Sequence, residues 1–206
     1  MDKREHIILK AIELFSEWGF DNTSIREISK KAGVNVAMIN YYFGSKEKLF
    51  EAMIEYKSQY LKVRLQELRE NTVLNEMEKI NIIIEEYVTR ILANPRYHRV
   101  LHQEMLLKTR PEVNAIIKNL FATNSQIIKG ILDDGKAKNL FRDVDNDLTI
   151  ATMFGTINHF MQTSNALAID AKEIKISEDE VYLRPRLINH LQQMLKTYLL
   201  KPEIKN

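Results

Sequence analysis

Histidine spacing offers one possible metal site in this 206-residue chain. His98 and His102 are one helical turn apart, so both could bind one ion, but no glutamate stands between them as in the His-Glu-x-x-His arrangement of zinc enzymes. His159 lies beside Phe160 in a long apolar stretch, which is more typical of a hydrogen-bonded core histidine than of a ligand. We therefore interpret the three histidines as structural, with the first two partly solvated.

The acidic stretch 143–147 begins like a calcium-binding loop, with aspartates at alternate positions. Such a loop requires glycine at its sixth position and glutamate at its twelfth, where Leu148 and Phe154 stand. We therefore predict an acidic turn that caps the following helix. The six glycines form neither a dinucleotide fingerprint nor a phosphate-binding loop. The sequence thus predicts no catalytic residues, no metal, no cofactor and no enzyme activity.

The segment from Asn35 to Tyr41 contains no acid or base, yet its side chains suit contact with DNA bases. Two asparagines can each donate and accept hydrogen bonds, and the short apolar residues between them can contact thymine methyl groups. Arg26, Tyr41 and Lys46 belong to the types that bond phosphate oxygens. The predicted DNA-contacting residues are Ser24, Arg26, Asn35, Val36, Ala37, Met38, Asn40, Tyr41 and Lys46.

Charge supports this interpretation locally and not over the whole chain. The formal net charge is +2, which by itself favours no class of partner. Between Ser24 and Lys48, however, five lysines and arginines stand against two glutamates. A phosphate-binding surface in this protein would therefore be a local patch.

Helices must position these side chains, because the dominant hydrophobic period is 3.6 residues and no convincing hairpin pattern occurs. The predicted helices cover residues 3–18, 24–32, 35–43, 45–69, 75–93, 96–108, 111–134, 148–168 and 178–200. Ser24 and Glu27 form a capping box, and Asn35 is a good N-cap. Asp133 to Gly135 marks the predicted end of the seventh helix. The predicted fold class is all-α.

The third predicted helix is too short to be stable alone, so its neighbours must hold it. Ile39 and Phe43 can pack inward against Ile28, which leaves the segment from Asn35 to Tyr41 wholly or partly exposed. Two helices joined by a tight glycine turn form a helix-turn-helix, whose second helix enters the DNA major groove. The short helices thus fit a DNA-binding domain, but short amphipathic helices with glycine turns also occur in many helical cores, so the geometry alone leaves both interpretations open.

Several short elements stand at characteristic spacing in residues 19–54. They are Gly19-Phe20, Thr23-Ser24, Ile28, Ala32-Gly33-Val34, Tyr41-Tyr42-Phe43 and Ser45-Lys46-Glu47. This order resembles the signature of the tetracycline-repressor (TetR) family of bacterial transcription regulators. Many members have tyrosine at the position of Asn40 and histidine at that of Tyr42. These differences affect the expected operator sequence more than DNA binding itself.

The resemblance implies that residues 1–50 form a helix-turn-helix DNA-binding domain, with the recognition helix at about 35–43. It implies that residues 51–206 bind a small-molecule effector and form a homodimer through the last two long helices, 148–168 and 178–200. Such a dimer binds double-stranded operator DNA and represses genes until the effector binds. The lengths of these two helices are consistent with a four-helix bundle between two subunits.

Mainly apolar residues on the central predicted helices are candidates for the walls of the effector pocket, as ligand pockets are mostly apolar. The candidates are Tyr87, Met105, Phe121, Phe154, Asn158 and Met161. Each of them is equally typical of plain core. The eight methionines would suit an apolar and loosely specified ligand, although methionine also fills irregular gaps in a core.

No stretch is long and apolar enough to cross a membrane, and the absence of cysteine and of a signal peptide fits a cytoplasmic protein. The sequence therefore predicts a ligand-responsive transcription regulator, with repression as the expected mode. Two alternatives stay open, a helical adaptor that binds other proteins and a small helical enzyme. An adaptor would leave the exposed segment from Asn35 to Tyr41 without a role.

Overall fold

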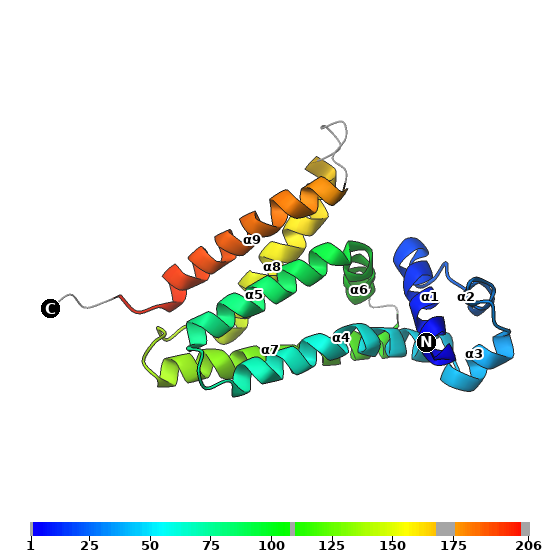
Figure 1. The fold of residues 1–206 in the computed structure, drawn as a ribbon, viewed down its shortest axis with the longest axis horizontal. Helices are drawn as coiled ribbons and strands as arrows, with labels where there is room; N and C mark the ends of the chain where they lie inside the picture. Colours follow the sequence, from blue (N-terminus) through cyan, green and yellow to red (C-terminus); the bar gives the residue numbers. More distant parts are fainter. Residues whose placement is uncertain (1, 108–109, 168–175, 203–206) are drawn as a thin grey trace. The chain divides into compact units, whose positions relative to one another are not determined.

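The computed structural model describes residues 2–107, 110–167 and 176–202, and each named element in these ranges is an α-helix (Figure 1). This confirms the predicted all-α fold. The helices are α1 (Lys3–Trp18), α2 (Ile25–Ala32), α3 (Val36–Phe43), α4 (Lys46–Glu70), α5 (Glu76–Ala93), α6 (Pro95–Leu107), α7 (Pro111–Ala137), α8 (Asn146–Leu167) and α9 (Ile176–Leu199). Across the described ranges, none of these helices is long and apolar enough to span a membrane.

The chain packs into two compact units. Unit 1 comprises Met1–Lys62 and Asn94–Thr123, so α6 and the first part of α7 belong with α1, α2, α3 and most of α4. Unit 2 comprises Val63–Ala93 and Asn124–Asn206, which hold α5, α8, α9 and the rest of α4 and α7. The division of functions after residue 50 stays a prediction.

Three phenylalanines form the centre of the unit 1 core. The rings of Phe15 and Phe20 stack with centroids 5.5 Å apart, and the Phe50 ring packs edge-on against them at 5.3 and 5.1 Å. Helix α6 packs against α1 and adds the buried side chains of Tyr97 and Val100 to the same core. The three N-terminal helices therefore share one hydrophobic core with α6.

Local hydrogen bonds and one special backbone angle set the turns on either side of α2. The buried Thr23 hydroxyl donates to the Gly19 carbonyl oxygen at 2.8 Å. The predicted capping box is confirmed, since the Glu27 amide donates to the Ser24 hydroxyl at 3.2 Å and the reciprocal bond is also present. Gly33 ends α2 at φ 65°, a left-handed conformation that glycine adopts at little cost. The angle between α2 and α3 is thus encoded locally.

In unit 2, helix α9 packs along α5 (Figure 1), and Gln192 of α9 donates to the Glu85 carboxylate of α5 at 2.9 Å. The connection between α7 and α8 holds the far end of α9. There, the Arg142 amide donates to the Leu199 carbonyl oxygen at 2.7 Å, beside the buried ring of Phe141. Helices from both halves of the unit 2 sequence therefore share one packed body.

The predicted end of the seventh helix at 133–135 is wrong, because α7 continues to Ala137. Gly135 lies within the helix at a point where the ring of Phe141 packs so closely that a Cβ atom would overlap it. The amides of Leu140 and Phe141 both donate to the Gly135 carbonyl oxygen, at 2.9 and 3.0 Å. The glycine therefore serves a close approach and not a helix stop.

The acidic stretch 143–147 caps α8 as predicted, because the Leu148 amide donates to Asp145 Oδ1 at 3.0 Å. In the part of the chain that the structure describes, no cluster of three or more His, Asp or Glu side chains could hold a metal ion. The predicted ends of two helices at Lys108 and Ala168 lie outside the described residues.

Candidate nucleic-acid interface and effector site

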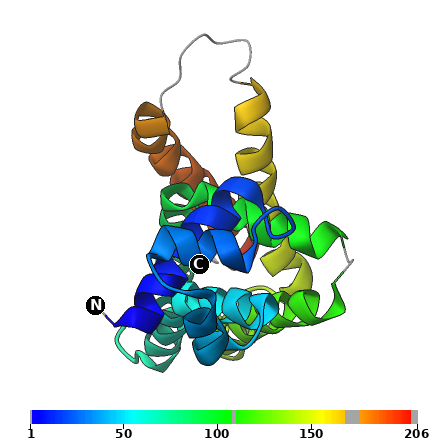
Figure 2. The ribbon, with the colours of Figure 1, turned by 90° about the vertical axis from the view of Figure 1, so that its right-hand side faces the viewer.

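Helix α3 buries one side and exposes the other, as predicted (α1 to α3 are blue in Figure 2). Ile39 and Phe43 are buried in the unit 1 core. On the other side, the Tyr41 side chain is 84% exposed, and Ala37 and Asn40 are also exposed. An exposed aromatic side chain on a short and firmly held helix is available for contact with a partner.

Asn35 has a structural role that restricts its use in base recognition. It is the N-cap of α3, and its Oδ1 accepts a hydrogen bond from the Met38 amide at 2.8 Å. Its Nδ2 group takes no part in this cap bond, so it can still donate to a base or a phosphate. Met38 itself is half-buried against the unit 1 core, so part of its side chain supports α3.

The N-terminus of α2 offers a second group of candidate contacts. Ser24 and Arg26 are both exposed there. Backbone and side-chain hydrogen bonds from Ser24 hold the pKa of the Glu27 carboxyl below its ordinary value, so Glu27 is charged at neutral pH. Free amides and an arginine at a helix N-terminus suit a phosphate group, although the Glu27 carboxylate already occupies part of this site.

Lys46, a predicted phosphate contact, is half-buried at the start of α4. Its Nζ lies 4.3 Å from the centroid of the Phe20 ring and donates to the Asp21 carbonyl oxygen at 3.4 Å. Burial lowers the pKa of the Lys46 ammonium, an effect partly opposed by the charge of Asp21. The stem of this lysine is thus packed in unit 1, which restricts how far its charge can reach.

An arginine that the sequence analysis did not single out joins the same cluster. The Arg110 guanidinium forms ion pairs with Glu104 and Asp21, and its Cζ lies 4.7 Å from the centroid of the Phe20 ring. The Glu104 side chain is 6% exposed, whereas that of Asp21 is 70% exposed. Through these contacts Arg110 connects α6 to the turn between α1 and α2.

Arg4 is a further exposed residue beside the predicted interface. Its guanidinium carbon lies 5.4 Å from the centroid of the Phe43 ring at the end of α3. A cation there could add a phosphate contact next to the predicted recognition helix. The available sequence signal was the adjacent pair Lys3-Arg4 near the N-terminus.

The predicted effector residues fall in both compact units. Met105 and Phe121 pack against the unit 1 core. In unit 2, the rings of Tyr87 and Phe154 meet with centroids 4.4 Å apart, and Asn158 follows one turn later on α8, where it is half-buried. Met161, also half-buried, completes the unit 2 set.

Asn124 is a buried polar residue on α7 that the sequence analysis did not include among these candidates. It lies close enough to the Tyr87 hydroxyl to influence the pKa of that group. The sequence signal was weak, because an asparagine in a long helix is usually at the surface.

Comparison with known proteins agrees with this architecture. Residues 7–53 match the bacterial regulatory proteins of the tetR family, and residues 74–162 match the tetracyclin repressor-like C-terminal domain. The chain belongs to the TetR family. The resemblance first drawn from residues 19–54 is therefore confirmed, and the chain is a transcription regulator with an N-terminal helix-turn-helix.

Relatives of this TetR-family chain include the transcriptional repressor NicS of Pseudomonas putida, which is 31% identical over 192 residues covering 85% of each chain. Another is the nucleoid occlusion factor SlmA of Shewanella baltica, 24% identical over 79% of this chain and 85% of its own. Among solved structures, FadR of Bacillus subtilis in complex with stearoyl-CoA aligns with a TM-score of 0.71 at 23% identity, covering 91% of this chain and 96% of FadR. An HlyIIR mutant protein aligns with a TM-score of 0.72 at 24% identity, covering 98% of each chain.

Proposed function

We propose that this protein is a homodimeric, cytoplasmic repressor that binds a palindromic operator and releases it when a small apolar effector binds. The observation that carries this proposal is the exposed side of α3, which ends in the 84% exposed ring of Tyr41 and is held by a packed helical core. The NicS relative, named a transcriptional repressor, supports repression as the mode of action.

The predicted contacts fall into two groups with different effects on binding. Ala37 and Asn40 are exposed on α3, as is Asn35 at its N-cap, and these side chains would contact base edges. Arg26, Tyr41 and Lys46 would bind phosphates and set the position of the helix on the duplex. Two copies of α3 in a dimer would read half-sites about 34 Å or a multiple of it apart, because that is one turn of DNA.

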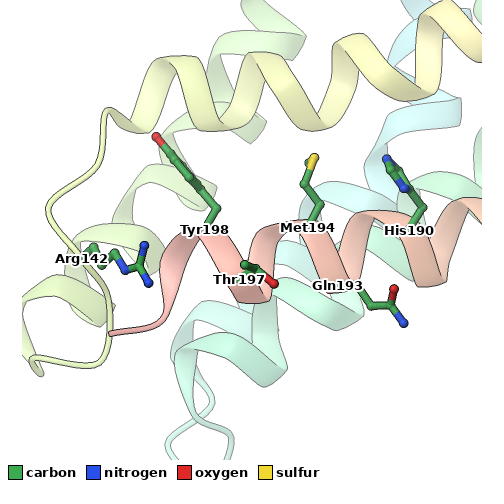
Figure 3. Close-up of a pocket in the computed structure, with 6 residues that line it drawn as sticks. All are labelled: Arg142, His190, Gln193, Met194, Thr197 and Tyr198. Atoms are coloured by element: carbon green, nitrogen blue, oxygen red, sulfur yellow. The ribbon is translucent and has the colours of Figure 1, made fainter. Parts of the chain in front are cut away.

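The last two helices supply an exposed face suited to the second copy of the chain. A groove of about 520 Å³ on α9 is lined by Arg142, His190, Gln193, Met194, Thr197 and Tyr198. Figure 3 shows Met194 and Tyr198 extending from α9 on the side of α8. Leu148 on α8 and Tyr198 on α9 are 64% and 46% exposed, and exposed apolar side chains of this size favour burial against a partner.

Light scattering tests the dimer. The monomer mass is 24.2 kDa, so the proposed dimer has about twice that mass at micromolar concentration. Tyr198→Glu places a charge on the proposed contact face and should yield monomers, whereas Val73→Glu, on a 90% exposed turn residue, should leave the dimer intact. A particle of monomer mass for the unaltered protein would refute the dimer.

Effector binding would act by favouring a conformation in which the two recognition helices no longer match the operator. A ligand that prefers this conformation by ~3 kcal/mol lowers operator affinity roughly a hundredfold. A shift of α4 is the proposed link, because this helix has residues in both compact units. The FadR structure, in complex with stearoyl-CoA, supports a small-molecule ligand for this fold.

Selection of bound duplexes from a random DNA pool tests the function directly. We expect a palindrome whose half-site spacing fits a dimer, with affinity that falls steeply as salt rises. Lys46→Ala should weaken binding to all sequences about equally and flatten the salt dependence by about one unit. The matched control is Lys62→Ala, which replaces an exposed lysine further along α4. It should change neither the affinity nor its salt dependence. Equal binding of selected and random duplexes at every salt concentration would refute specific regulation.

A further inference from the structure

Among the buried side-chain polar atoms of unit 2 that have no hydrogen-bond partner in the described part of the chain, two belong to residues that lie near each other. They are the hydroxyl oxygen of Tyr87 on α5 and Oδ1 of Asn124 on α7. These residues are 6% and 5% exposed. A buried polar atom without a partner destabilises a folded protein, so each such atom calls for an explanation.

The two side chains lie close to each other. Burial raises the pKa of the Tyr87 hydroxyl, and the nearby Asn124 side chain partly opposes that rise. The opposing effect is that of a hydrogen-bond donor, the Asn124 amide, near the hydroxyl oxygen, but the geometry between the two groups falls short of a hydrogen bond, and Asn124 Oδ1 also has no partner. Phe154 of α8 packs edge-on against Tyr87, with ring centroids 4.4 Å apart. Three helices therefore bring together the Tyr87 hydroxyl, the Asn124 amide and the Phe154 ring.

These groups select a definite ligand chemistry. The Tyr87 hydroxyl can donate to an acceptor, and Asn124 Oδ1 can accept from a donor, so one head group carrying both functions would satisfy both atoms. Neither side chain carries a charge at neutral pH, and a charged group buried beside them would lose its hydration without gaining a counter-ion from them. Arg90, one turn further along α5, already forms an ion pair with Glu86 at 3.5 Å.

We propose that Tyr87 and Asn124 form the polar end of the effector site, and that they bind an uncharged aromatic molecule whose head group both donates and accepts a hydrogen bond. This inference rests on the proposed ligand-responsive function. The aromatic body follows from the rings of Tyr87 and Phe154, which favour a third ring in edge-on or offset contact. Phe154 and Asn158 are half-buried, so this side of α8 is where such a ligand would enter.

Titration calorimetry with three probes of similar size tests the head-group chemistry. The probes are benzamide, which donates and accepts, benzoate, which is charged, and toluene, which does neither. We expect benzamide to bind about tenfold more tightly than the other two, within a concentration range of up to about 10 mM suited to so small a ligand. Absence of saturable benzamide binding over this range, or tighter binding of benzoate, would overturn the proposal.

Variants separate this role from a structural one. Tyr87→Phe and Asn124→Leu should each weaken benzamide binding about tenfold and leave toluene binding unchanged. Both should also keep or raise the thermal midpoint of the free protein, because each removes a buried polar atom that has no partner. Tyr97→Phe, which alters another buried tyrosine in unit 1, is the matched control and should leave benzamide binding unchanged.

Two results with the variants would count against the proposal. Unchanged benzamide affinity in Tyr87→Phe would show that the hydroxyl does not bind the ligand. A lowered thermal midpoint in both variants would show that the two groups serve the fold. Operator binding by the wild-type protein without any probe is measured separately. If it fails, the proposed function is wrong, whereas intact operator binding without benzamide preference defeats the effector inference alone.

Discussion

Replacing Arg110 with methionine tests how strongly this residue, directly before α7, stabilises the turn between α1 and α2. The substitution keeps most of the apolar stem and removes the guanidinium that pairs with Glu104 and Asp21. The decisive quantity is the burial of Glu104, whose side chain is 6% exposed. Without Arg110, this carboxylate must be hydrated by local opening or must take up a proton.

Removing one partner of a buried ion pair costs about 3–5 kcal/mol. The contact with Asp21, which is 70% exposed, contributes at most about 1 kcal/mol, and the cation over the Phe20 ring contributes about 0.5–2 kcal/mol. The positive charge of Lys46 also acts within this cluster and compensates in part. We therefore expect Arg110→Met to lower the free energy of unfolding of unit 1 by about 3 kcal/mol, the low end of the range for a buried pair.

Urea unfolding followed by tryptophan fluorescence measures this change in unit 1. Trp18 is the single tryptophan of the chain, lies on α1 and is 42% exposed. For a slope of about 1.5 kcal/mol per molar urea, the expected shift of the midpoint is about 2 M. Asp21→Asn is the control and should shift it by less than about 0.7 M, because an exposed pair is worth little.

A double variant separates loss of the ion pair from loss of packing. Glu104→Leu combined with Arg110→Met removes both charges, so no buried carboxylate remains, and most of the lost stability should return. If Arg110→Met costs no more than Asp21→Asn, the buried pair does not stabilise unit 1. If the double variant is less stable than Arg110→Met, the reasoning from an unpaired buried charge is wrong.

Two further predictions concern unit 2. Gly135→Ala should lower the free energy of unfolding by about 1–3 kcal/mol, because the added Cβ would overlap the buried ring of Phe141. Gly130→Ala should lower it by less, because the group that its Cβ would overlap is the flexible end of an arginine. Equal urea midpoints for the two would contradict this. The second prediction concerns Glu76, which is 2% exposed. Burial raises the pKa of its carboxyl group, but a hydrogen bond from Lys138 at 2.6 Å outweighs this effect and keeps the pKa below the ordinary 4.5. The stabilisation is therefore present above pH 4.5 and is lost as pH falls through the lowered pKa. Lys138→Met should have a lower free energy of unfolding than the wild type at pH 7. Urea unfolding from pH 7 to pH 3 should show this difference between variant and wild type becoming smaller. A difference that stays constant over this range would refute a stabilising Lys138–Glu76 pair.

Much of the helix-turn-helix could be predicted from the sequence because its determinants are local. The capping box of Ser24 with Glu27, the N-cap at Asn35 and the left-handed Gly33 each depend on residues within four positions. The periodic placement of Ile39 and Phe43 was enough to assign the inner and outer sides of α3. Short-range hydrogen bonds and hydrophobic periodicity leave the same pattern in any sequence that uses them, so these features needed no tertiary information.

Tertiary structure alone decided the features that join distant parts of the chain. Arg110 meets Asp21 across 89 positions, and Asn124 of α7 influences the pKa of the Tyr87 hydroxyl on α5. Gly135 looked like a helix stop until the approach of Phe141 showed why it lacks a side chain. Such contacts depend on how whole helices pack, and the type of one residue does not identify the distant residue that it contacts. The sequence alone thus determined the helices of the helix-turn-helix. Only the packing of those helices decided which charged and polar side chains are buried and which groups they contact.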